Sequence, residues 1–329
     1  MVGVPRLGIS NFQNSFFEII LVFGIAKAAY VIAIEREYMA MTISTGGRLR
    51  TVQTKHLAFR TLEGDGFEVR RAIPSRAYEA IGPFIFLDHF GPIEVKPGEA
   101  KGAPEHPHAG IETLTLLLEG RSVHKDSLGN ASVMQPGEVQ WMRAGRGIVH
   151  DEGPGDSMLR EGGLTHGVQL WLNMPKGHKH DEPAYRHLKA DEIPVIQGKN
   201  SFARIIAGRS GDAEGPVTSM GHPFVAHASL RAGGSLGLAV SQPQEVALYV
   251  LTGSLTLGDA QIASGWLARL SPGDSIVLES EVSSEILLLG GDPLDAPIVR
   301  HGPFVMNTIS ELEQAIRDYH AGKMGRIAA

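Results

Sequence analysis

The sequence predicts an all-β protein made of two related β-domains, followed by a short C-terminal helix. Glycine and proline are frequent, at 40 and 19 of the 329 residues. They separate short runs rich in β-branched, leucine and aromatic side chains, which is the pattern of strands joined by turns. The runs fall into two halves of the chain that resemble each other. The length also suits two domains better than a single core.

The strands of the first half can be located by their composition. The stretches 126–130 (DSLGN) and 136–137 (PG) are turn sequences between them. The β-rich runs themselves occupy residues 67–73, 112–120, 121–126, 138–144 and 167–175.

A polar stretch bounded by proline, 176–194, divides the two halves and indicates a linker. Strands resume at 202–208 and continue to about residue 290. We therefore expect an N-terminal extension (1–40), a first β-domain (41–175), a linker (176–200), a second β-domain (201–300) and a C-terminal segment with a helix (301–329).

The two halves align through their turns. The run LLLEGRSV matches YVLTGSLT through Gly120 and Gly253, and QPGEV then matches SPGDS through Pro136 and Pro272. A slightly longer hairpin in the second half absorbs the difference in spacing. Self-similarity on this scale indicates two homologous domains rather than a solenoid.

The C-terminal helix is predicted from its capping pattern and its apolar face. Ser310 and Glu313 fit a capping box, and Gly322 is placed to end the helix. The apolar side chains of this segment recur on one face, which we expect to pack on a β-domain; they are Leu312, Ala315, Ile316 and Tyr319.

The N-terminal extension is apolar over residues 16–35 but carries Glu18 and Lys27. Those charges disfavour a membrane span or a signal peptide. We expect a disordered or packed extension, or a start codon assigned upstream of the real one at Met39 or Met41.

The overall composition excludes several classes of site. Lys and Arg number 30 against 36 Asp and Glu, which gives a net charge of −6 and disfavours direct binding to nucleic acid. The chain has no cysteine, so disulfides, thiolate metal sites and cysteine nucleophiles are excluded. Any metal ion must be held by His, Asp or Glu.

Two short segments together predict a metal site. His106 and His108 are two residues apart, so both side chains lie on the same face of a strand. His150 and Glu152 repeat this spacing in a second segment. Imidazole and carboxylate ligands without sulfur suit Fe(II), Mn, Co, Ni, Cu or Zn. Glu112 has the same strand parity as His108, so the spacing alone does not choose between Glu112 and Glu152 as the carboxylate.

A second pair of histidines has the same spacing but a different context. His178 and His180 lie in the charged linker, and no second pair accompanies them. We expect this pair to be polar surface residues rather than metal ligands.

Several long runs resemble the pirin family of the cupin superfamily, in particular bacterial pirin-like proteins. The resemblance covers roughly residues 48–326. The runs that carry it, in order, are FLDHFGP (86–92), HPHAGIETLT (106–115), HKDSLGN (124–130), PGEVQWMRAGRGIVHDE (136–152) and GPFVMNT (302–308).

The resemblance implies a bicupin fold, in which two antiparallel β-barrel (jelly-roll) domains follow each other and only the first binds metal. It implies that His106, His108, His150 and Glu152 hold the ion, normally Fe(II), and so it favours Glu152 over Glu112.

The internal repeat agrees with a second barrel that lacks metal. Transferred through the aligned turns, the four candidate ligands of the first domain correspond to Ala239, Ser241, Ile286 and Leu288 in the second. None of these side chains is a suitable metal ligand.

The resemblance implies quercetin 2,3-dioxygenase activity, in which a flavonol reacts with O2, its heterocycle opens and carbon monoxide leaves. Glu152 is the candidate general base for the 3-hydroxyl proton. Trp141 and Met142 precede the second ligand pair and are candidates either for the pocket wall or for the core.

An alternative reading is a non-enzymatic, iron-binding, redox-sensitive regulator that binds protein partners, as a transcriptional co-regulator or a modulator of metabolic enzymes. A site without room for a substrate would favour it. We expect a cytoplasmic protein that binds neither nucleic acid nor a membrane directly.

Overall fold

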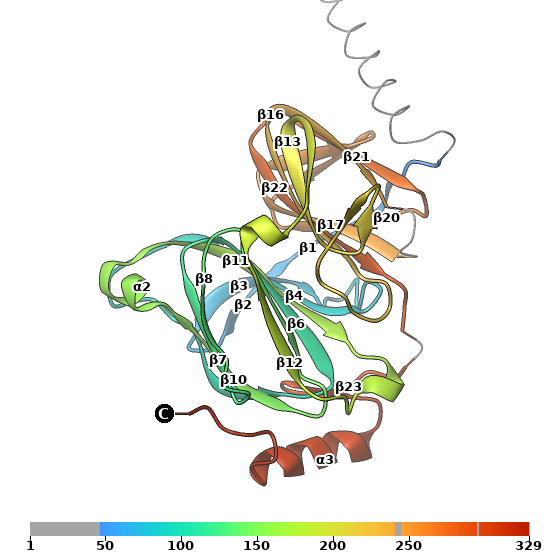
Figure 1. Cartoon of the computed structure of the whole chain (residues 1–329). Coiled ribbons are helices and arrows are strands. Elements are labelled where there is room, and N and C mark those ends of the chain that lie inside the picture. The colour runs from blue at the N-terminus through green and yellow to red at the C-terminus, as the bar shows by residue number, and fades with distance from the viewer. Residues whose placement is uncertain (1–46, 241–244, 295, 329) are drawn as a thin grey trace, which may run out of the picture. The chain divides into compact units, whose positions relative to one another are not determined.

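The computed structural model describes residues 47–240, 245–294 and 296–328. The predicted N-terminal extension (1–40) lies outside the described residues. The chain from Arg48 onward forms one compact unit. Two antiparallel β-barrels and a C-terminal helix make up this unit, as expected from the sequence (Figure 1). Within the described ranges, no helix has the length and apolarity needed to span a membrane.

The first barrel is built from a seven-stranded and a four-stranded antiparallel sheet. The larger sheet has the strand order β12(Ala184–Leu188), β9(Val139–Arg143), β6(Ile111–Glu119), β11(Gly163–Asn173), β4(Phe84–Val95), β3(Phe67–Ile73), β2(Phe59–Glu63). The smaller sheet has the order β5(Ala103–His108), β10(Ile148–Pro154), β7(Ser122–Asp126), β8(Ala131–Met134).

The second barrel is a single nine-stranded sheet in which β13(Val195–Ala207) pairs with β16. The other strands follow the order β1(Val52–Leu57), β20(Trp266–Leu270), β17(Glu245–Thr252), β22(Ser284–Gly291), β16(Phe224–Ala239), β21(Ser275–Ser280), β18(Ser254–Leu257), β19(Ala260–Ala263).

Smaller elements connect and close the barrels. They are the hairpins β14(Arg209–Ser210)–β15(Ala213–Glu214) and β23(Val299–His301)–β24(Phe304–Met306), the 3-10 turns η1(Lys176–His178) and η2(Ala190–Glu192), and the helices α2(Asp156–Glu161) and α3(Ile309–His320).

The barrels exchange segments at both ends of the chain. β1 precedes the first barrel in sequence, yet it pairs with β20 of the second. Conversely, β24 follows the second barrel but lies against the first, where Val305 N–H donates to the Ala109 carbonyl at 3.0 Å. The predicted domain bounds, 41–175 and 201–300, do not account for this exchange, because β1 lies within 41–175 but pairs with the second barrel.

The stretch predicted as a linker, 176–200, is largely structured. β12 pairs with β9 along its whole length, from Ala184 opposite Arg143 to Leu188 opposite Val139, and β13 begins at Val195. The linker prediction is therefore wrong over these strands. Its polar composition reflects an edge strand, which is half exposed to solvent.

The C-terminal helix α3 begins two residues earlier than the predicted capping box. Thr308 is the N-cap and accepts from Glu311 N–H, so Thr308 and Glu311 take the roles expected of Ser310 and Glu313. The end of the helix is as predicted, since Gly322 has a φ of +72°. The predicted apolar face packs on Ala109 and Val149 of the first barrel. Figure 1 shows α3 along the end of this barrel.

The apolar core is distributed differently in the two barrels. The interior of the second barrel is filled by aliphatic side chains such as Leu236, Leu248 and Leu288. In the first barrel, Leu114 and Leu170 point outward and join Tyr249 and Leu287 in a core between the barrels. Since side chains alternate along a strand, the opposite, inward positions of these first-barrel strands are left for polar residues.

The two barrels align through Gly137 and Gly265. Both glycines have positive φ, +84° and +83°. The N–H of Gly137 donates to the Leu117 carbonyl, and the N–H of Gly265 donates to the equivalent Val250 carbonyl. Pro272 instead lies between β20 and β21, one hairpin later. The predicted match of Pro136 with Pro272 is therefore wrong, because proline–glycine turns occur at two different places in the repeat.

The corrected alignment changes the counterparts of the candidate ligands. Ile286 and Leu288 lie on β22, which corresponds to β11 rather than to β10, and Ser241 is outside the described residues. The strand pair β16–β21 of the second barrel corresponds to β5–β10 of the first. At the positions of the four candidate ligands it carries buried side chains, which are Leu236, Leu238, Leu278 and Ser280. A second barrel without metal stays a prediction, now supported by these four residues.

Candidate metal centre

Three of the four predicted ligands converge inside the first barrel. β5 and β10 are antiparallel neighbours, with His106 opposite His150 and His108 opposite Ile148. The Nε2 atom of His106 lies 3.1 Å from Nε2 of His108 and 2.9 Å from Nε2 of His150. His106 and His150, 44 positions apart in sequence, thus meet because their strands pair.

The hydrogen bonds of two of these rings determine which nitrogen carries the proton. His106 Nδ1 donates to the Pro104 carbonyl at 2.7 Å, and His108 Nδ1 donates to the Pro303 carbonyl at 3.2 Å. A carbonyl oxygen can only accept, so in the neutral rings both Nε2 atoms carry lone pairs. Two lone pairs that face each other at 3.1 Å repel unless a cation lies between them. This arrangement fits a metal ion.

The electrostatic environment keeps the imidazoles of His108 and His150 in their metal-binding form. Burial, with a smaller contribution from His106, lowers the pKa of His108 to about 3. Burial and the neighbouring imidazoles also hold the pKa of His150 well below its ordinary value. Neutral imidazole is the form that binds metal ions. The Nδ1 atom of His150 is buried and has no hydrogen-bond partner among the described residues.

Glu152, the fourth predicted ligand, lies on the same strand as His150. Its Oε1 is 4.0 Å from His150 Nδ1. Burial raises the pKa of its carboxyl group, while His124 and His106 oppose this effect. Glu152 falls in a second group of possible ligands, with His150 and His124, whose donor atoms lie within 4.8 Å of one another. His150 is common to both groups.

His124 was not predicted as part of the site. It lies on β7 opposite Glu152, its Nε2 is 3.1 Å from Asp126 Oδ2, and its ring stacks on Tyr185 at 4.2 Å. Asp126 also accepts from Asn130. A carboxylate behind an imidazole fixes its orientation. The period-two spacing of His124 and Asp126 was the available signal.

Glu112 does not belong to the site. The parity argument that placed it beside His108 fails because the chain turns at Gly110, where φ is +75°, and alternation does not continue across a turn. Glu112 is buried and accepts from Trp141 Nε1 at 3.0 Å. Burial raises the pKa of its carboxyl group.

A cavity of about 390 Å³ opens beside the candidate ligands, and His106, His108 and Glu152 are among its lining residues. This volume is within the range of small-molecule sites, roughly 300–1,000 Å³. Trp171 forms part of the wall: its ring lies 5.0 Å from that of His108 and stacks on Phe86 at 4.2 Å.

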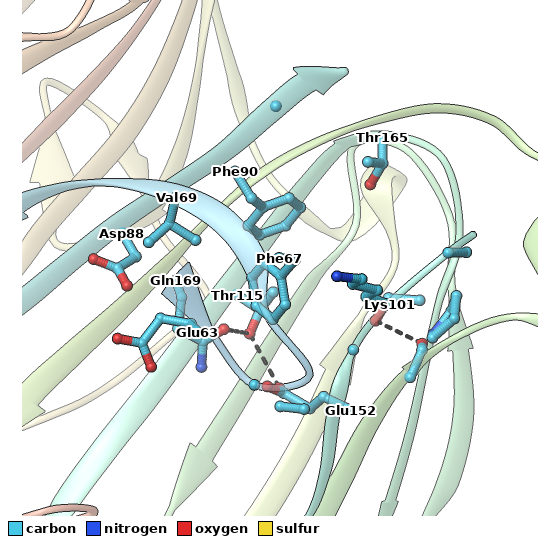
Figure 2. Close-up of a pocket in the computed structure, with 18 of the residues that line it drawn as sticks. Glu63, Phe67, Val69, Asp88, Phe90, Lys101, Thr115, Glu152, Thr165 and Gln169 are labelled. Carbon is cyan, nitrogen blue, oxygen red and sulfur yellow. Dashed lines mark hydrogen bonds between the residues drawn. The ribbon is translucent and has the colours of Figure 1, made fainter. Parts of the chain in front are cut away.

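One polar side chain of the opposite sheet, Thr115, contacts the carboxylate of Glu152. Figure 2 shows Thr115 between Gln169 and Glu152. The Thr115 hydroxyl lies 2.7 Å from Gln169 Oε1 and 3.5 Å from Glu152 Oε1, so two acceptors share its single proton. Gln169 and Trp171 alternate with the outward Leu170, a period-two pattern that sequence inspection could have used.

Two further predictions concern nearby residues. Trp141 and Met142 do not line the cavity; Trp141 packs against the core between the barrels and Met142 belongs to an apolar cluster at the end of the first barrel. His178 and His180 pair with Asp181 and Glu311 and belong to neither group of possible metal ligands among the described residues.

Comparisons with known proteins agree with the fold. Residues 66–172 match the family model for pirin, and residues 225–325 match that for the pirin C-terminal cupin domain. A Pseudomonas aeruginosa protein provisionally named quercetin 2,3-dioxygenase is 38% identical over 287 residues, which is 84% of this chain and 98% of that protein.

Human pirin is 35% identical over 286 residues, which cover 85% of this chain and 95% of the human protein. The crystal structure of a quercetin 2,3-dioxygenase from Acinetobacter baumannii matches with a TM-score of 0.79 at 34% identity, over 85% of this chain and 100% of that one. Both cupin domains are covered, and the chain belongs to the pirin family of the cupin superfamily.

Proposed function

We propose that this protein is a metal-dependent dioxygenase of the quercetin 2,3-dioxygenase type, which cleaves a flavonol with O2 and releases carbon monoxide. The observation that carries the proposal is the cavity, since His106, His108 and Glu152 line a space of about 390 Å³. A purely regulatory metal site has no need of such a space. The names of the Pseudomonas and Acinetobacter relatives support the same reaction.

The proposed ligands are His106, His108, His150 and Glu152, and the proposed ion is Fe(II), although Mn, Co, Ni, Cu and Zn accept the same donors. When bound, the ion supplies a Lewis acid that binds substrate oxygens and stabilises the flavonol anion. A bound flavonol offers its 3-hydroxyl and 4-carbonyl oxygens to this end of the cavity.

Glu152 is the proposed general base. Its carboxylate lines the cavity beside His106 and His108, within reach of the 3-hydroxyl of a substrate bound there. Thr115 holds the carboxylate from the side, and Gln169 holds Thr115. The resulting flavonolate reacts with O2, its heterocycle opens and carbon monoxide leaves, so that the other atoms of the flavonol and both atoms of O2 are retained in the products.

The aromatic wall suits a planar substrate. Phe86 and Trp171 stack on each other beside His108, and Arg71 lies over the Phe86 ring at 4.4 Å, so the wall is held rigid by packing on both aromatic rings. Arg71 is itself fixed by a two-point contact with Asp88, at 2.8 and 2.7 Å. A rigid aromatic surface positions a flat ring system with little loss of side-chain entropy.

The test follows aerobic quercetin loss and carbon monoxide release by the Fe(II)-loaded protein, with metal content measured in parallel. We expect turnover in the wild type and a loss of about 100-fold or more in His108→Ala and Glu152→Gln. His178→Ala is the matched control, because this histidine has the same spacing but lies outside the site. Protein that holds one iron per chain and shows no turnover would refute the dioxygenase and favour the redox-sensitive regulator.

A further inference from the structure

A lysine in the stretch predicted as a linker is completely buried. Lys179 has 0% relative exposure. Its Nζ donates to the Gly110 carbonyl at 2.7 Å, to the Val305 carbonyl at 2.9 Å and to Asn173 Oδ1 at 2.5 Å. These acceptors are uncharged oxygens, so they solvate the ammonium group without neutralising it. Burying a charge in this way costs free energy, and the hydrogen bonds must offset that cost.

The two carbonyls held by Lys179 flank the metal centre. Gly110 lies in the turn that directly follows His108, and Val305 lies two residues after Pro303, whose carbonyl accepts the proton of His108 Nδ1. The segments fit closely, because a Cβ atom on Gly110 would lie 1.9 Å from the Val305 oxygen. Lys179 therefore fastens the C-terminal strand to the turn beside a candidate ligand.

His108 depends on a distant part of the chain in a way that His106 does not. The acceptor for His106 Nδ1 is the carbonyl of Pro104, two residues away on the same strand. The acceptor for His108 Nδ1 is 195 residues away. A small displacement of the C-terminal strand would thus remove the partner of His108 and leave that of His106 in place.

We propose that Lys179 is a positioning residue of the metal centre: by tying Gly110 to Val305, it keeps the Pro303 carbonyl where it orients His108 and sets its tautomer. The inference rests on the metal centre of the proposed function. Outer partners of a ligating imidazole typically change metal affinity by about 10- to 100-fold when lost. Lys179 acts through His108 and does not itself contact the ion.

The experiment compares wild type with Lys179→Met by titration calorimetry with Co(II) or Ni(II). We expect binding about 10- to 100-fold weaker in Lys179→Met. Lys176→Met, an exposed lysine three residues away, is the matched control and should bind as the wild type does. Imidazole nitrogen-15 NMR of the metal-free proteins should show a single tautomer for His108 in the wild type and a mixture of tautomers in Lys179→Met. His106 should keep a single tautomer in both proteins.

Chemical rescue separates the ammonium group from general packing. The chain has no cysteine, so Lys179→Cys, alkylated by 2-bromoethylamine while unfolded and then refolded, places an ammonium at the same reach. We expect this treatment to restore metal affinity. If Lys179→Met does not fold, Asn173→Ala removes one partner of the ammonium and should weaken binding by a smaller factor.

The outcomes are distinguishable. Equal metal affinity and an unchanged His108 tautomer in Lys179→Met, or in Asn173→Ala where that variant replaces it, would overturn the inference. Wild-type protein that binds no metal would instead refute the proposed function, and the tautomer comparison in metal-free protein would still decide the role of Lys179.

Discussion

We predict that His89 makes the core between the two barrels sensitive to acid. Its Nδ1 lies 3.2 Å from the hydroxyl of Tyr249 in the second barrel, and its Nε2 lies 2.9 Å from Nε2 of His166. Both histidines are buried, with 1% and 4% exposure. Burial, reinforced by His166 and Arg70, lowers the pKa of His89 to about 3. The change to test is His89→Gln, which keeps hydrogen-bonding capacity and cannot be protonated in this range.

The size of the effect follows from the two pKa values of His89. The ring is neutral in the folded protein down to about pH 3, whereas in the unfolded chain it takes up a proton below its ordinary value of 6.5. The stability contribution of this group is therefore complete above 6.5 and falls as the pH decreases toward 3. At about pH 5 the loss is 1.5 pH units at 1.36 kcal/mol each, or about 2 kcal/mol.

The assay is urea unfolding of wild type and His89→Gln at about pH 7.5 and pH 5, followed by tryptophan fluorescence. Other histidines also titrate between these pH values. The quantity compared is therefore the change in unfolding free energy between about pH 7.5 and pH 5, in the wild type and in the variant. We expect the wild type to lose about 2 kcal/mol more than His89→Gln between the two pH values. Equal losses would show that His89 is not held neutral in the folded protein and would refute the reasoning.

Three further predictions concern the site and its surroundings. Thr115→Val should lower kcat about tenfold with metal affinity unchanged, because Glu152 loses its side contact; a change in metal affinity instead would contradict this. Gly110→Ala should destabilise the protein by several kcal/mol in urea unfolding, since its φ is +75° and a Cβ atom would meet the Val305 carbonyl; wild-type stability would contradict the described fit. Co(II) at about 100 times its Kd should stabilise the wild type by about 2.7 kcal/mol in thermal unfolding, and His150→Ala should show no such shift.

The candidate histidine ligands could be proposed from the sequence because each pair follows a local rule. A spacing of two residues places His106 and His108 on one face of a strand, and the same holds for His150 and Glu152. Glu112 could not be assigned by that rule, since its relation to His108 passes through the turn at Gly110. The hydrogen-bond acceptor of His108 could not be predicted for a different reason. Pro303 is distant along the chain and contributes a backbone oxygen, which any residue type could supply.

The fold was predictable as a class but not in its connections. Alternation and turn residues indicate strands, and the repeat indicates two domains. They do not state which strands pair, so they place β1 in the first domain and β12 in a linker, although β1 pairs in the second barrel and β12 in the first. The repeat itself was misaligned by one hairpin because Pro272 and Pro136 occupy similar turns in different places. The strand order and the hydrogen bonds of Gly137 and Gly265 distinguish these turns.

The return of β24 to the first barrel has a consequence for protein synthesis. A ribosome delivers His108 long before Pro303, which is 195 residues later in the chain. At about 5–20 residues per second, roughly 10–40 seconds separate the two. During that time the first barrel lacks the strand that packs beside His108, so the nascent chain carries an incomplete site. The contact that orients the His108 ring therefore forms only after β24 has been synthesised and has docked on the first barrel.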